Sequence, residues 1–96
     1  MYIGACKVRL TAEWVSSLKE KRMVVRSLVE KTKNKFNVSV AEVDDQDIWQ
    51  SVVLGFACVS NDARHADAMA QNVLRFIEGA TDAVAGDVVI EVLRID

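Results

Sequence analysis

The chain has 96 residues, about half of them apolar and none of them proline, and a formal net charge of −2. This length supports one domain, residues 1–96, and the apolar content excludes a disordered chain. No apolar run approaches the ~20 residues that cross a bilayer, and no signal-peptide pattern follows Met1. We therefore expect a cytoplasmic protein that does not insert into membranes.

The first predicted element is a strand over Tyr2–Thr11, in which side chains alternate between two faces. Its core-facing residues are Cys6, Val8 and Leu10, and its other face carries Ala5, Lys7 and Arg9. A loop through Ala12–Ser16 follows and carries Trp14. This tryptophan, like Trp49 further on, fits either an interface anchor or a cover at the edge of the core.

The stretch Ser17–Phe36 predicts one amphipathic helix, on which the rest of the chain depends. Ser17 and Glu20 form the spacing of a capping box at its start. At ~100° per residue an apolar stripe emerges, formed by Leu18, Val25, Leu28, Val29, Thr32 and Phe36. Basic residues border that stripe: Lys19, Arg22, Arg26 and Lys33 on one flank, and Lys21 and Lys35 on the other.

Two further strands are expected over Asn37–Val43 and Trp49–Ser60, joined by a short acidic turn into a hairpin. The segment Trp49–Ser60 is apolar on both sides, which is typical of a central strand. A second helix is expected to begin near Ser60–Asp62 and end near Glu78, before Gly79. A last strand is expected over Asp87–Ile95.

The element order is therefore βαββαβ, which predicts an α+β, ferredoxin-like sandwich. In that plan a four-stranded antiparallel sheet carries both helices on one face. The first and third strands are central, in agreement with the two-sided apolar pattern of Trp49–Ser60.

Three segments carry a family resemblance: SLKEKR at 17–22, FNVSVAEVDDQDIWQ at 36–50 and LGFACVSND at 54–62. In this combination and order the chain resembles the YlxP-like family of small conserved bacterial proteins, over most of its length. The resemblance implies a ferredoxin-like fold and no established biochemical activity. It also implies a gene neighbourhood of transcription elongation, translation initiation and ribosome maturation, near the ribosome-binding factor A gene.

Charge is divided unevenly along the chain. Residues 1–35 carry nine basic and three acidic side chains, a net +6, whereas residues 36–96 carry three basic and eleven acidic ones, a net −8. Such a division suggests a polyanionic partner or a second copy of the chain, or two solvated faces that differ in sign. The hypothesis for a polyanion is RNA, such as rRNA in a ribosomal particle, contacted through its phosphates by Lys19, Lys21, Arg22, Arg26, Lys33, Lys7 and Arg9.

The face of the sheet away from the helices predicts a second kind of contact. On the central strands its residues are small or charged, with an apolar centre at Gly55 and Ala57, and no aromatic residue is placed there to stack on bases. A flat apolar surface allows another sheet to approach closely. We therefore expect a homodimer through this open face, with an interface at Val53, Gly55, Ala57 and Leu93. Self-association without nucleic-acid binding is the alternative function.

Other chemistry-bearing residues point away from catalysis, and no metal or cofactor is expected. The acidic turn with Asp44, Asp45 and Asp47 could hold Mg²⁺ or Ca²⁺, contact a basic helix of a neighbouring molecule, or bond its own backbone N–H groups, but it lacks the EF-hand pattern. His65 falls in the first turn of the second helix, off its apolar stripe, without an orienting partner. Cys6 and Cys58 lie in apolar strands and are expected as small core residues. The chain is therefore expected not to be an enzyme.

Overall fold

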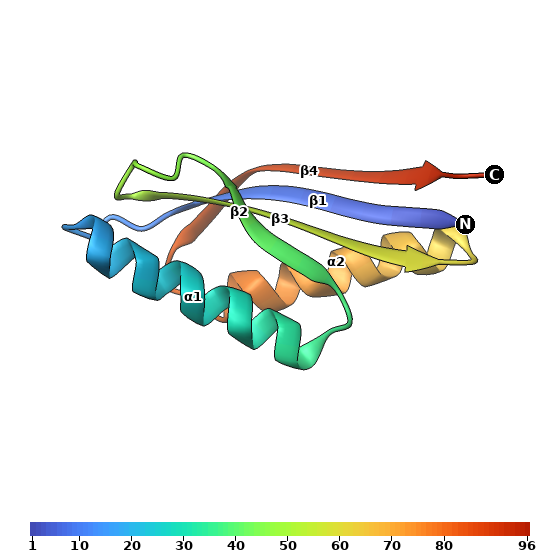
Figure 1. Ribbon diagram of the computed structural model, residues 1–96, viewed down its shortest axis with the longest axis horizontal. Helices are drawn as coiled ribbons and strands as arrows, with labels where there is room; N and C mark the ends of the chain where they lie inside the picture. Colours follow the sequence, from blue (N-terminus) through green and yellow to red (C-terminus); the bar gives the residue numbers. More distant parts are fainter.

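The computed structural model describes residues 1–96 and contains four strands and two helices. In chain order they are β1 (Tyr2–Thr11), α1 (Leu18–Lys35), β2 (Ser39–Asp44), β3 (Ser51–Ser60), α2 (Ala63–Gly79) and β4 (Val84–Arg94). The strands form one antiparallel sheet in the order β2-β3-β1-β4, and both helices cover the same face (Figure 1). This is the predicted ferredoxin-like fold with β1 and β3 in the centre. No helix is both long and apolar enough to cross a bilayer.

The core lies between the helices and the sheet, where the alternation of the strands directs their apolar side chains. Leu28, which belongs to the predicted apolar stripe of α1, lies in the same buried cluster as Val8, Leu54 and Phe56. At the far end of α1 the rings of Phe36 and Phe76 meet edge to face, with centroids 5.4 Å apart. Such aromatic pairs stabilise contacts beyond the area they bury, and this one joins α1 to α2.

Both helices begin at side-chain caps. Ser17 is the N-cap of α1, and its hydroxyl accepts a hydrogen bond from the Glu20 N–H at 3.1 Å. The Glu20 carboxylate does not return to Ser17 as a capping box would; it accepts from the Ser16 hydroxyl at 3.1 Å. Asp62 caps α2 by accepting from the Arg64 N–H at 2.8 Å. These caps satisfy N–H groups that the first helical turn leaves without partners.

The buried face of α1 is rotated from the predicted stripe. Its fully buried residues are Lys21, Leu28 and Thr32, whereas Leu18, Val25 and Val29 are only partly buried. The stripe centre therefore shifts towards Lys21, which apolar periodicity excludes from a core. The Thr32 hydroxyl donates to the Leu28 carbonyl at 2.7 Å, so this buried polar group is satisfied within the helix.

Strand boundaries differ from prediction where the backbone leaves regular pairing. β4 begins at Val84, not Asp87, because an extra residue is accommodated between the pairs Lys7–Val89 and Arg9–Gly86. This bulge places Asp87 at a positive φ of 49°. β3 begins at Ser51, because Trp49 and Gln50 belong to the turn.

Candidate nucleic-acid interface

One row of basic side chains runs along the outward flank of α1. Its members are Lys19, Arg22, Arg26 and Lys33, which share a strip about 60° wide on the helical wheel and are all exposed. We call this set the basic row. At ~1.5 Å of rise per residue it extends about 21 Å along the helix. Partly buried Val25 and Val29 lie between the basic row and the core-facing side of the helix.

The charges of the basic row are free of internal partners. Every ion pair in the molecule involves other cations: Arg9, Lys21 and Arg94. Glu30 projects beside the row, but it lies within ion-pair distance of none of its members. Unpaired cations in one line set up a positive potential that an anion can reach without displacing a protein carboxylate.

Lys21 is not part of this surface, which corrects the sequence-based hypothesis. Lys21 is only 1% exposed. Its ammonium lies 3.0 Å from Glu42 Oε2 and donates a hydrogen bond to the Asp45 carbonyl. Glu42 Oε2 accepts no hydrogen bond from any other group. Lys21 therefore fastens α1 to the end of β2 and cannot contact RNA phosphates. The acidic turn meets the basic helix of its own chain through this lysine.

Lys7 and Arg9 lie on the opposite side of the molecule from the basic row. They alternate with buried Val8 on β1, so they project from the open face of the sheet, away from both helices. Arg9 is also engaged, 3.4 Å from the Asp45 carboxylate and 3.9 Å from that of Asp87. One duplex cannot lie along the basic row and reach these two side chains, so the seven predicted cations do not form one site.

The Arg9 cluster holds together the two strained positions of the backbone. Asp45 and Asp87 are the two non-glycine residues with positive φ, at 52° and 49°, and both pair with the same guanidinium. Asp45 also accepts from the Ser51 hydroxyl at 2.8 Å, while Asp44 accepts from the Asp45 N–H at 2.8 Å. No three acidic, histidine or cysteine side chains converge as a metal-binding group, and the observed contacts of this turn are with its own chain.

The open face differs from the predicted interface at one end. Val53 is only 1% exposed within its own chain. It lies at the end of the open face where β3 pairs with Arg9 of β1. A methyl group added at Gly55 would lie 2.9 Å from Val43 Cγ1, so this glycine admits a side chain of the same chain. Ala57 is partly buried and Leu93 is 48% exposed. Only the half of the face beyond Gly55 is therefore open.

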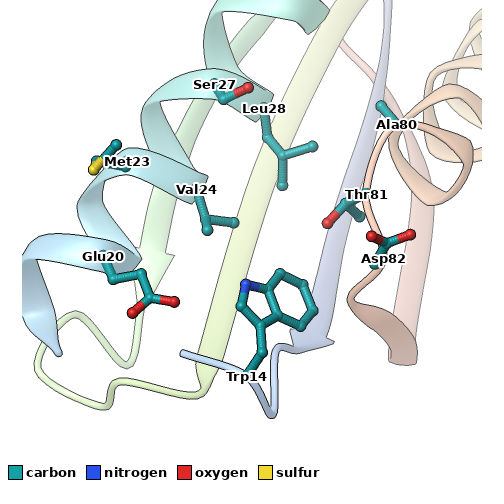
Figure 2. Close-up of a pocket in the computed structure, with 9 residues that line it drawn as sticks. All are labelled: Trp14, Glu20, Met23, Val24, Ser27, Leu28, Ala80, Thr81 and Asp82. Carbon is teal, nitrogen blue, oxygen red and sulfur yellow. The ribbon is translucent and has the colours of Figure 1, made fainter. Parts of the chain in front are cut away.

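The inward flank of α1 borders a shallow groove that the sequence did not indicate. Figure 2 shows the Trp14 ring below Val24 and Leu28, with Thr81 and Asp82 opposite, from the segment between α2 and β4. The groove has a volume of about 360 Å³, and Trp14 is half exposed in it. The sequence features that could have indicated this groove are Trp14 and the exposed Met23. Periodicity does not connect them, because Trp14 lies in a loop and Met23 lies on a helix.

The remaining chemistry-bearing residues, His65, Cys6 and Cys58, do not come together in one site. His65 is exposed in the first turn of α2, as predicted, and takes part in no hydrogen bond or ion pair. Cys6 and Cys58 are free thiols in the core. Burial raises the pKa of the Cys6 thiol to about 11, and the Glu78 carboxylate adds to this shift. A thiol of that pKa stays protonated at neutral pH and is a poor nucleophile.

Comparison with known proteins places these features in a family. A model described as "Protein of unknown function (DUF503)" matches residues 3–90. A relative from Bacillus subtilis (strain 168), named "Uncharacterized protein YlxP", is 44% identical over 62 residues, which cover 65% of this chain and 67% of the relative. The sequence-based resemblance to the YlxP-like family is thereby confirmed.

Proposed function

Because this chain belongs to the DUF503 family of unknown function, we propose its function from its own surface: it is a non-catalytic module that binds RNA through the basic row. The partner is structured RNA such as rRNA or a ribosomal precursor particle. The observation that carries the proposal is the unpaired, exposed state of Lys19, Arg22, Arg26 and Lys33. The gene neighbourhood implied by the family resemblance agrees with it.

The chemistry of the basic row favours phosphate contacts over base readout. Lysine and arginine contact phosphate oxygens, and such contacts fix position without carrying sequence information. Sequence-specific RNA readers add aromatic side chains on which bases stack. Trp14 lies on the other flank of α1, and Trp49 lies in the turn before β3. The proposed binding is therefore weak and tolerant of sequence.

The acidic remainder of the chain restricts where RNA can lie. Residues 36–96 carry a net charge of −8, which repels phosphates from α2 and the strands that follow α1. Lys31 and Lys35 lie on the other flank of α1, and Lys35 lies over the Phe76 ring at 5.3 Å. RNA should thus follow the outward flank of α1 only.

The test compares two charge reversals of equal size. Arg22→Glu with Arg26→Glu alters the basic row, while Arg64→Glu with Arg75→Glu makes the same change in net charge at exposed positions of α2. Purified proteins are titrated with structured rRNA fragments at low salt. We expect the first pair to weaken binding by tenfold or more on every RNA, and the second pair to have a smaller effect. Equal effects of the two pairs, or no binding by the unmodified chain, would overturn the proposal.

A further inference from the structure

The two edges of the sheet differ in how they are protected. β2 has six residues, a bulge at Val43 and the acidic side chains of Glu42 and Asp44. Figure 1 shows β2 (green) running at an angle to the other strands of the sheet. Short length, bulges and charges are the features that prevent one sheet edge from pairing with another. The β2 edge is therefore closed to a second strand.

The β4 edge lacks these protections along most of its length. It has eleven residues, and its bulge lies near its start at Asp87. Beyond the bulge the segment Val88–Leu93 is apolar except for Glu91. An exposed, long and apolar edge strand presents free N–H and C=O groups to another strand.

Exposed apolar side chains of β4 project from both faces of the sheet. Val89 and Leu93 pair with Lys7 and Ile3 on the open face, and they are 52% and 48% exposed. Val92 pairs with buried Gly4 on the helix-covered face and is 37% exposed. A partner stacked on the open face would cover only the first set. A strand added at the edge lies beside both sets.

We propose that β4 pairs antiparallel with β4 of a second copy, so that two four-stranded sheets become one. A twofold axis perpendicular to the sheet generates this pairing, and the contact is closed after two subunits. Both open faces then lie on the same side. The partner is a second copy of the chain, because β4 can pair with itself without placing like charges opposite each other.

The pairing centred on Ile90 avoids opposition of like charges. It sets Val88 against Val92 of the partner subunit, and Glu91 against Val89 of the partner subunit. Arg94 then reaches the bulge of the partner subunit, which contains the partner's Asp87 beside Gly86. A Cβ added at Gly86 would meet nothing within 4 Å, so there is room for that arginine. Cross-strand apolar pairs stabilise a sheet, and opposed like charges destabilise it.

This dimer is independent of the basic row. α1 packs on β2 and α2, whereas α2 packs on β1 and β4. The two basic rows would therefore lie at the outer ends of the joined sheet, away from the contact. Substitutions in the basic row should leave the dimer intact, and substitutions in β4 should leave each subunit able to bind RNA.

The test is the mass of the full chain in solution, with matched variants at two valines. Light scattering of the unmodified protein should give twice the 10.6 kDa of one chain over a concentration series up to about 0.5 mM. Val92→Lys places a charge on the side of β4 that only an edge partner reaches. It should raise the dissociation constant of the dimer by at least about tenfold.

Val59→Lys is the control, because Val59 is 64% exposed on the open face of β3, away from the β4 edge. It should leave the mass unchanged. Hydrogen exchange gives a second readout that does not depend on a variant: amides of β4 should exchange more slowly as the protein concentration rises. A monomer at all concentrations, or a dimer broken by Val59→Lys and not by Val92→Lys, would overturn the inference.

Discussion

The two flanks of α1 carry the same kind of side chain and place it in opposite environments. Lys21, on the core side, is buried and paired with Glu42 at 3.0 Å. Arg22, its neighbour in sequence, is exposed and unpaired. The comparison teaches that a count of basic residues on a helix overstates its binding surface. The position of each residue relative to the core decides whether its charge stabilises the fold or remains free for a partner.

The largest expected effect on stability comes from replacing Lys21, the buried lysine on the core side of α1. Lys21→Met leaves the Glu42 carboxylate partly buried without its cation, and removal of one member of a buried pair costs about 3 kcal/mol or more. The free energy of unfolding, measured with urea, should fall by about that amount.

A second variant separates the ion pair from the packing of the lysine stem. Lys21→Met with Glu42→Gln removes both charges and should recover most of the lost stability, because an uncharged pair has little desolvation penalty. If the single variant were as stable as the unmodified protein, Lys21 would not have the structural role assigned to it.

The buried Cys6 thiol should make the free energy of unfolding depend on pH. In the folded protein the Cys6 thiol has its pKa raised to about 11, mainly by burial. An unfolded thiol ionises near pH ~8.5. The folded state therefore holds the proton more tightly than the unfolded state. The stability that this adds is fully present at neutral pH and is lost as the pH rises from about 8.5 to about 11.

This contribution is on the order of 3 kcal/mol between about pH 8.5 and 11. Cys6→Ala should be less stable at pH 7 because it leaves a cavity, but its stability should fall less steeply with pH above 8.5. Parallel slopes for the two proteins would contradict the dry environment of this thiol.

The fold was predictable because its main signals are periodic. Alternation in Tyr2–Thr11 and the two-sided apolar pattern of β3 were sufficient to place both central strands. The site was only partly predictable, because tertiary contacts bring together residues that no local pattern connects. The burial of Lys21 depends on a carboxylate 21 residues away in sequence. The ion pairs of Arg9 depend on Asp45 and Asp87, each at a bulge or turn.

The smallest stability effect belongs to the outer flank. Arg26→Ala removes an exposed side chain with no ion pair and replaces it with a better helix former. The free energy of unfolding should change by no more than about 0.5 kcal/mol. Thermal unfolding measures this, and a loss as large as that of Lys21→Met would mean that the two flanks are not distinct.

The salt dependence of RNA binding tests the central claim most directly. If the basic row neutralises about four phosphates, the slope of log affinity against log salt should be near −3 to −4, taking the duplex coefficient of ~0.9 per phosphate. Arg22→Ala with Arg26→Ala should make that slope shallower by about 2, while Arg64→Ala with Arg75→Ala should leave it unchanged. A slope near zero, or one that the α2 pair alters as much as the basic-row pair, would contradict the assignment of RNA binding to the outward flank of α1.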